Sequence, residues 1–244
     1  RRPYALPVGS RLNDEREVKH MRRNIAIVIL LLMSLPIIGD EKDKHPPTRW
    51  EETIKKFEAA DEKSPPKPGG ALFIGSSSIR LWDLAKHFPQ EKNAINRGFG
   101  GSHMADSTHY AERIALPYEP RVIFIYAGDN DINAVKTPQR VLSDYQAFVK
   151  KIHAELPKTR IAYIAIKPSI ARWKLVEKMR EANALIRKET ESDERLSFID
   201  IDTPMIGDDG KPRPELFVKD GLHLSEAGYE IWSDLVRPHL AGEG

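Results

Sequence analysis

Three consecutive serines stand directly after a short apolar run of the sequence. The run covers residues 71–74, Gly75 ends it, and Ser76, Ser77 and Ser78 follow. Serines at the end of a strand commonly cap the helix that comes next. A serine hydroxyl in such a place can also attack a carbonyl carbon, provided that a neighbouring base takes its proton. The other polar residues of the chain decide between capping and catalysis.

Glycines, an amide, acids and a histidine follow the later apolar runs of the chain. In chain order they are Gly98, Gly100 and Gly101, then Gly128, Asp129, Asn130 and Asp131, and finally Asp220 and His223. Each group alone has an ordinary explanation, because such residues also form turns and decorate helix starts. Together, however, a hydroxyl, backbone donors, an amide, an acid and a base are the parts of a serine hydrolase.

Alternating strands and helices must bring these residues together. Apolar runs rich in β-branched residues cover 71–74, 93–96, 121–126, 161–166 and 196–201. Helical stretches lie between and after them, at about 79–88, 104–114, 138–155, 173–191 and 225–238. The runs are apolar at odd and even positions alike, which indicates strands buried on both faces. We predict an α/β fold, a three-layer α/β/α sandwich with a five-stranded parallel sheet of the flavodoxin-like type. Ligands of such sheets bind at the carboxyl ends of the strands.

The order of these residues resembles the SGNH (GDSL-type) hydrolases, a family named for Ser, Gly, Asn and His in four separate blocks. Residues 75–77 (Gly-Ser-Ser) resemble the first block, and their register makes Ser77 the nucleophile. Gly101 falls on the glycine of the second block. Residues 128–130 (Gly-Asp-Asn) match the Gly-x-Asn block, and residues 220–223 (Asp-Gly-Leu-His) match the Asp-x-x-His block.

The resemblance covers about residues 70 to 240, and it departs from the family at one visible position. Ser76 stands where the first block of the family has Asp. That position is not among the four catalytic ones, so the departure concerns hydrogen bonds around the nucleophile more than the reaction. Gly100 stays an alternative to the matched glycine of the second block, since it is one residue away.

The resemblance implies a two-step acyl transfer to water through an acyl-enzyme. Ser77 would attack the carbonyl carbon, His223 would take its proton, and Asp220 would orient the imidazole. The backbone N–H groups of Ser77 and Gly101 and the side-chain amide of Asn130 would hold the oxyanion. Imidazole changes its protonation state near neutral pH, which suits a general base. A helix that begins at Ser77 would add free N–H groups and a partial positive charge.

Four further side chains near the predicted strand ends are candidates for contacts with substrate. They are Arg97, Lys167, Arg172 and Trp173. Surface charge and packing of the indole are the simpler explanations for them. No long apolar insertion that could form a lid is evident, which favours small acyl groups. We expect a serine esterase for short acyl or carbohydrate acetyl esters. The alternatives are a lysophospholipase-type lipid hydrolase and a non-catalytic carbohydrate-binding module on the same fold.

Composition excludes several other classes of function. The 244 residues include no cysteine, which excludes disulfides, thiolate zinc sites and cysteine nucleophiles. A net charge of +2 is too small to indicate the basic surface that binds nucleic acid. The spacing of the histidines predicts no metal site, and residues 97–102 do not form the Gly-x-Gly-x-x-Gly motif of dinucleotide sites. We therefore expect a small-molecule or glycan ester as the partner, and no cofactor.

A long N-terminal stretch has the pattern of a targeting segment. Met21 is followed by two arginines, an apolar stretch at about 24–38 and a small residue. This pattern is typical of a secretory signal peptide, here residues 21–39. The apolar stretch is shorter than the roughly 20 residues of a spanning helix, and a signal anchor is the alternative. Residues 1–20 are interpreted as an upstream extension. The leader predicts an exported protein, periplasmic or secreted, with membrane contact only if the leader is uncleaved.

The remainder of the chain divides at a cluster of proline and glycine. Residues 40–69 are interpreted as a linker with an N-terminal helix at about 50–61, where apolar residues recur at helical spacing. The proline and glycine cluster at 63–70 interrupts that helix. We predict one hydrolase domain over residues 70–242.

Overall fold

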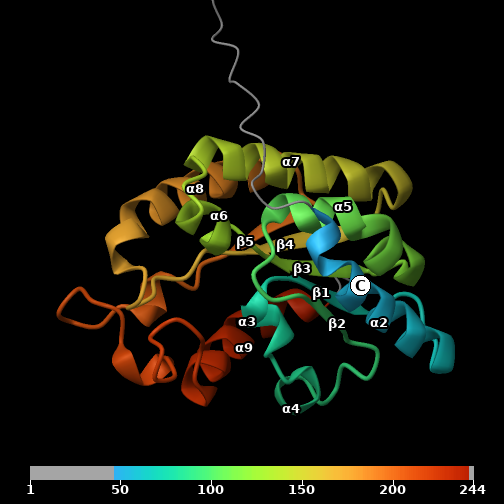
Figure 1. The fold of residues 1–244 in the computed structure, drawn as a ribbon, viewed down its shortest axis with the longest axis horizontal. Helices are drawn as coiled ribbons and strands as arrows, with labels where there is room; N and C mark the ends of the chain where they lie inside the picture. The colour runs from blue at the N-terminus through green and yellow to red at the C-terminus, as the bar shows by residue number, and fades with distance from the viewer. Residues whose placement is uncertain (1–46, 242–244) are drawn as a thin grey trace, which may run out of the picture. The chain divides into compact units, whose positions relative to one another are not determined.

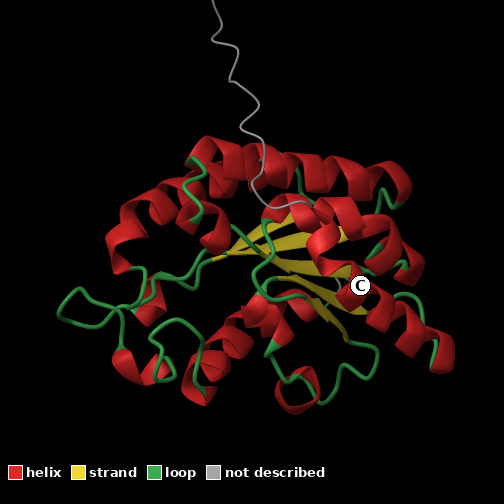
Figure 2. Ribbon diagram, in the orientation of Figure 1, coloured by secondary structure: helices red, strands yellow, loops and turns green. Residues whose placement is uncertain are grey.

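Five parallel strands form the central layer of the structure, a computed structural model that describes residues 47–241. In spatial order the strands are β2 (Ile95–Gly98), β1 (Ala71–Gly75), β3 (Val122–Tyr126), β4 (Arg160–Ile164) and β5 (Leu196–Ile199). Every neighbouring pair is parallel. Figure 2 shows the sheet in yellow with helices on both sides. The predicted three-layer α/β fold with a five-stranded parallel sheet is confirmed.

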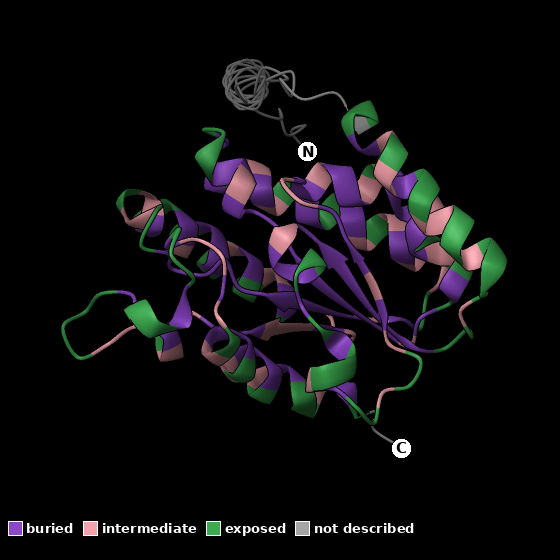
Figure 3. Ribbon diagram, turned by 60° about the horizontal axis from the view of Figure 1, so that its bottom comes forward, coloured by how far each residue is buried: buried purple, intermediate pink, exposed green. Residues whose placement is uncertain are grey.

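Helices cover both faces of the sheet because the strand side chains are apolar on both sides. Along β1, Leu72 and Ile74 join one apolar cluster, and Ala71 and Phe73 join the other. The helices over the first cluster are α2 (Glu51–Lys63), α5 (Met104–Ile114), α7 (Pro138–Glu155) and α8 (Val176–Thr190). The helices over the second are α3 (Ser77–Arg80), α4 (Leu84–His87) and α9 (Glu226–Leu240). Figure 1 shows the two helix layers, and Figure 3 shows the buried strands between them.

The chain reverses its direction of travel across the sheet between β1 and β3. From β1 it crosses to β2 at one edge, and it then returns past β1 to add β3, β4 and β5 on the other side. Ligand sites of parallel sheets lie at such a switch point, at the carboxyl ends of the strands. The short helix α6 (Asp129–Asn133) begins there, just after β3. Single 3₁₀ turns complete the described elements, at Pro47–Trp50, Leu116–Tyr118, Trp173–Leu175, Thr203–Met205 and Pro214–Leu216.

Most predicted helices agree with the structure, with one informative exception. The helices expected at 104–114 and 138–155 are confirmed as α5 and α7. The single helix expected at 79–88 is wrong, because the chain forms two short helices there, α3 and α4. Asp83 separates them, since its side chain accepts a hydrogen bond of 3.1 Å from the backbone of α4 and so starts a new helix. Trp82, only 2% exposed, turns into the apolar cluster at the break.

The helix α2 belongs to the same packed unit as the sheet. Ile54 of α2 is fully buried, and Trp50, just before the helix, is 5% exposed. Arg113 of α5 pairs with two glutamates of α2. The interpretation of residues 40–69 as a linker is therefore wrong for α2, because this helix covers part of one sheet face and the packed unit begins before residue 70.

The predicted leader at residues 21–39 and the extension at residues 1–20 lie outside the described residues. Among residues 47–241, no helix combines the length and the apolar character that crossing a membrane requires. Export therefore stays a prediction from the sequence.

Candidate active site

Ser77 is the first residue of α3 and follows the end of β1 almost directly. The turn between them depends on Gly75, whose φ is +137°, a conformation that L side chains rarely adopt. A Cβ on Gly75 would lie 2.0 Å from the carbonyl oxygen of Tyr126 in β3, so a larger residue does not fit. Ser76 donates its backbone N–H to the same carbonyl at 3.1 Å. This turn presents the half-buried Ser77 at the carboxyl edge of the sheet.

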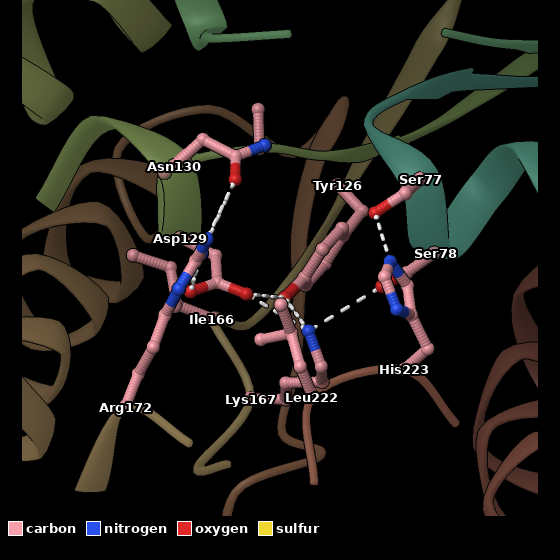
Figure 4. Close-up of polar contacts among 12 residues, drawn as sticks. Ser77, Ser78, Tyr126, Asp129, Asn130, Ile166, Lys167, Arg172, Leu222 and His223 are labelled. Carbon is pink, nitrogen blue, oxygen red and sulfur yellow. Dashed lines mark hydrogen bonds and ion pairs between the residues drawn. The ribbon is translucent and has the colours of Figure 1, made fainter. Parts of the chain in front are cut away.

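The imidazole of His223 meets the hydroxyl of Ser77, although 146 positions separate them in the sequence. His223 Nε2 lies 3.1 Å from Ser77 Oγ, as Figure 4 shows. On its other side, His223 Nδ1 lies 2.6 Å from Asp220 Oδ2. The hydrogen bond from the His223 ring and those from the backbone of Leu222 and His223 lower the pKa of Asp220 to about 2. Asp220 is therefore ionised at neutral pH and accepts Nδ1–H, which leaves Nε2 to accept a proton from Ser77.

Two neighbouring loop segments hold the turn that carries His223. Gly221 in this turn has a φ of +64°. Its N–H donates a hydrogen bond of 2.9 Å to the Val218 carbonyl, and its carbonyl accepts a hydrogen bond of 3.0 Å from the Ala171 N–H. Val218 in turn donates its N–H to the His223 carbonyl at 2.9 Å. A Cβ on Gly221 would lie 3.1 Å from the Cβ of Ile170. The loop after β4 therefore packs closely against the turn and fixes where the imidazole stands.

Gly101 and Asn130, the predicted oxyanion donors, lie on loops that are bonded to each other. Gly101 has φ +79° in a turn closed by a 3.3 Å bond from the Ser102 N–H to the Phe99 carbonyl. Asn130, in α6, donates its side-chain Nδ2 to the Ser102 carbonyl at 3.1 Å. Because β1 and β2 are adjacent strands, the loop of Gly101 starts beside the turn of Ser77. The structure thus gathers all four predicted blocks at one edge of the sheet.

Arg97 and Lys167, predicted as substrate contacts, are buried and paired with protein groups. Arg97 is 8% exposed, donates Nε to Tyr118 Oη at 2.9 Å and pairs with Asp61. Lys167 is 2% exposed, and its Nζ lies 2.8 Å from Asp129 Oδ2. Because both charges face partners inside the protein, the prediction of a direct contact with substrate is wrong for these two residues.

Arg172 and Trp173 lie in the loop after β4, nearer to the site. The Arg172 side chain is 14% exposed, and its guanidinium binds the side chains of Asp129 and Asn130. Trp173 is half-buried, with its ring against cationic side chains of α8 and of the loop after β5. Arg172 is therefore linked to a predicted oxyanion donor, whereas Trp173 packs between structural elements.

A buried ionic network that the sequence did not reveal lies beside the serines and Asn130. We call it the Asp129 network; it consists of Tyr126, Asp129, Lys167 and Arg172. Lys167 donates Nζ to Tyr126 Oη at 3.0 Å and reaches Ser78 Oγ at 3.4 Å. Burial would raise the pKa of Asp129, but Lys167 and Arg172 together hold it below its ordinary value. The sequence contained one indication of this network: charged residues that directly follow buried strands need partners of opposite charge.

The residues that meet at this edge define the chemistry that the site can perform. They supply a nucleophile, a base, an acid and several hydrogen-bond donors, which together suit acyl transfer. Within residues 47–241, no cluster of three or more histidine, aspartate or glutamate side chains is arranged to hold a metal ion.

Comparisons with known proteins identify the family of the chain and structures that share its fold. A sequence profile of the GDSL-like Lipase/Acylhydrolase family matches residues 80–231. Human platelet-activating factor acetylhydrolase IB subunit alpha1 is 26% identical over 187 residues, which cover 74% of this chain and 78% of that protein.

Two solved structures share the fold. A GDSL-like lipase from Bacteroides thetaiotaomicron has a TM-score of 0.67 at 18% identity and covers 77% of this chain and 96% of its own. A family 3 carbohydrate esterase from Clostridium thermocellum has a TM-score of 0.58 at 14% identity and covers 71% of this chain and 98% of its own. The chain therefore belongs to the GDSL-like Lipase/Acylhydrolase family and is a hydrolase that acts on esters.

Proposed function

We propose that the protein is a serine esterase that hydrolyses carboxylic esters through an acyl-enzyme on Ser77. One observation carries this proposal. His223 Nε2 lies 3.1 Å from Ser77 Oγ while His223 Nδ1 lies 2.6 Å from Asp220 Oδ2. A hydroxyl, an imidazole and a carboxylate at these distances form the proton-transfer chain that acyl transfer requires.

Acylation begins when Ser77 Oγ attacks the carbonyl carbon of the ester and its proton passes to His223 Nε2. The ionised Asp220 accepts Nδ1–H and stabilises the imidazolium. Negative charge moves onto the former carbonyl oxygen, which accepts hydrogen bonds from the backbone N–H groups of Ser77 and Gly101 and from Asn130 Nδ2. The bond from carbon to the alcohol oxygen then breaks, and His223 gives its proton to the departing alcohol. Water, deprotonated by His223, attacks the acyl-enzyme, and release of the carboxylic acid restores Ser77.

The substrates that we propose are short acyl esters or carbohydrate acetyl esters. The side chains of Asp220 and His223 are 48% and 29% exposed, so the base and its acid lie at an open surface. An open surface suits an ester group that projects from a glycan chain. The fold shared with a family 3 carbohydrate esterase agrees with this substrate class. Export through the predicted leader at residues 21–39 would bring the enzyme to such substrates.

A lipid acyl hydrolase of the lysophospholipase type is the second candidate, and a specific observation favours it. Ile170 and Val218 are 45% and 47% exposed, and both lie against the turn that carries His223. His223 protonates the leaving alcohol, so these two aliphatic side chains lie on the side of the leaving group. An apolar leaving group would cover them. The relative named platelet-activating factor acetylhydrolase agrees with this alternative.

The decisive experiment measures acetate release from a panel of acetylated glycans, together with p-nitrophenyl esters of increasing acyl length. A maximum at two to four carbons, with acetate released from a glycan, would support the first candidate. A maximum at long chains, with hydrolysis of lysophospholipid and no release from glycans, would support the second.

A non-catalytic carbohydrate-binding module is the remaining alternative. A fluorophosphonate probe, which labels activated serines, distinguishes it from both enzymes. We expect labelling of the wild-type protein and none of Ser77→Ala. A folded wild-type protein that binds glycans but takes no label would contradict an enzymatic function.

A further inference from the structure

Arg172 binds the two consecutive residues Asp129 and Asn130 at once. Its Nη1 donates to Asp129 Oδ1 at 2.6 Å and to Asn130 Oδ1 at 3.1 Å, and its Nη2 donates to Asn130 Oδ1 at 3.2 Å. Figure 4 shows the guanidinium between these two side chains. Arg172 comes from the loop after β4, so it connects that loop to the start of α6.

This arrangement determines which end of the Asn130 amide faces the active site. A guanidinium only donates hydrogen bonds, so the amide oxygen must face Arg172 and the amide nitrogen must face away. Asn130 Nδ2 accordingly points to the loop of Gly101, where one of its hydrogens binds the Ser102 carbonyl at 3.1 Å. The second amide hydrogen is left for a substrate oxygen. A flipped amide would put an acceptor where the oxyanion forms, which would repel it.

Arg172 is itself held in place by the Asp129 network. The Asp129 side chain is 5% exposed, and its second oxygen binds Lys167 Nζ at 2.8 Å. One carboxylate thus faces two cations, the buried Lys167 and the part-buried Arg172, and one positive charge is left over beside Asn130. A fixed positive charge near a developing oxyanion lowers the energy of the transition state, and it acts more strongly where water is excluded.

We propose that Arg172 is a positioning residue for the oxyanion hole, which acts by fixing and polarising the side-chain amide of Asn130. The proposal rests on the proposed function, because it assumes acyl transfer on Ser77. It replaces the role of substrate contact that the sequence suggested for Arg172. In the free site, the guanidinium makes its hydrogen bonds to protein oxygens.

The expected effect follows from the value of one oxyanion donor. Loss of such a donor typically lowers kcat by about 10²–10³-fold. Arg172→Ala leaves the donor in place but frees its orientation, so we expect kcat to fall by about 10–10²-fold, with KM changed by less than about threefold. Arg172→Lys keeps a charge beside Asp129, but an ammonium lacks the fork geometry that joins two acceptors. It should fold like the wild type and still lose kcat.

A double-mutant cycle with Asn130→Ala tests the proposal directly, with hydrolysis of p-nitrophenyl acetate as the readout. If Arg172 acts through Asn130, then Arg172→Ala will lower kcat by less than about threefold once Asn130 is already alanine. Guanidinium added to Arg172→Ala should restore part of kcat, and it should not restore Asn130→Ala. Arg187→Ala is the matched control, because Arg187 pairs with Asp200 at 2.8 Å and half of its side chain is exposed. It should keep wild-type kcat.

Failure of this proposal is distinguishable from failure of the proposed function. If Ser77→Ala keeps full activity, the proposed function fails. If Ser77 and Asn130 are required but Arg172→Ala and Arg172→Lys keep wild-type kcat, only the positioning role is refuted. Fully multiplicative losses in the double mutant would also overturn it, because they would show that Arg172 acts independently of Asn130. Should Arg172→Ala fail to fold, the same cycle is run with Arg172→Lys.

Discussion

Two carboxylates serve the two sides of this active site, and water reaches only one of them. The side chain of Asp220, behind the proposed base His223, is 48% exposed. The side chain of Asp129, behind the proposed oxyanion donor Asn130, is 5% exposed and pairs with Lys167 and Arg172. Figure 3 shows the same division on a larger scale, with exposed loops around a buried sheet.

The difference reflects what each side of the site has to do. In the proposed mechanism His223 takes up a proton and gives it back in each catalytic cycle, and an open setting near water suits such a change. The Asp129 network keeps constant charges, and its burial prevents the groups from moving. A buried charge is stable only when it is paired, so each member of the network depends on the others. We expect substitutions of the exposed acid to affect activity and substitutions of the buried acid to affect folding.

The largest effect is expected at the nucleophile itself. Ser77→Ala removes the attacking oxygen and should lower the rate of ester hydrolysis by at least about 10³-fold. Purified protein assayed on p-nitrophenyl acetate gives this measurement. The thermal unfolding temperature should stay near that of the wild type, since Ser77 is half-buried and its hydroxyl binds only His223 among residues 47–241. Nearly full activity of Ser77→Ala would exclude the assigned nucleophile.

The buried side of the comparison is tested by Asp129→Asn. This substitution leaves Lys167 and Arg172 without a counter-charge in the interior, and it should lower the free energy of unfolding by about 3–5 kcal/mol. Urea denaturation measures the change. The control is Asp234→Asn, which breaks an exposed pair with Arg237 and should change the free energy by less than about 1 kcal/mol. Equal effects of the two substitutions would show that burial does not separate these carboxylates.

The exposed side of the comparison is tested by Asp220→Asn. The asparagine can offer His223 the wrong hydrogen-bonding group and cannot stabilise the imidazolium, so we expect kcat to fall by about 10²–10⁴-fold, with the upper end equal to the loss that this change causes in a serine protease triad. Stability near pH 7 should change little, because half of the side chain is already in water. A loss of folding without a specific loss of kcat would reverse the distinction drawn between the two acids.

The smallest expected effect is the pH dependence of activity. The pKa of Asp220 in the folded protein is about 2, below its ordinary value of 3.8. Its contribution to stability is therefore complete above about pH 4 and is lost only as the pH falls through about 2. Between pH 5 and 8 Asp220 therefore stays ionised, so its own ionisation should add no step to the pH profile of p-nitrophenyl acetate hydrolysis in this range. A step in activity near pH 4 that disappears in Asp220→Asn would contradict this ionisation state of Asp220.

Much of the fold was predictable because its signals are local. Apolar runs without alternation indicated a parallel sheet, and α5 and α7 begin and end where helical spacing begins and ends. The break at Asp83 was not predicted, because an aspartate inside an amphipathic stretch can also lie on the polar face of one continuous helix. Only the structure shows that Asp83 caps a second helix. The packing of α2 on the sheet was also missed. The prolines and glycines at 63–70 end the helix, but they do not mark a boundary between packed units.

The candidate site was predictable to a different degree on its two sides. Ser77 follows β1, and Asp220 and His223 lie in the long loop between β5 and α9; their order along the chain is recognisable, and the fold brings them together. The partners of Lys167 were not predictable, because Asp129 lies 38 positions away and nothing in the local sequence specifies the pairing. Arg97 was misassigned for the same reason, since it pairs with Asp61 across 36 positions. A charge at a strand end indicates that a partner exists, but only the tertiary structure identifies it.

The loop after β4 contacts both halves of the proposed catalytic site within three consecutive residues. Ile170 and Ala171 hold the turn of the base, and Arg172 holds the amide of Asn130. Directed evolution for new substrates should therefore leave this loop unchanged, because any shift in it would misalign the base and the amide simultaneously. Random substitutions are better introduced at residues 206–218 after β5, where the exposed Val218 lies beside the turn of His223.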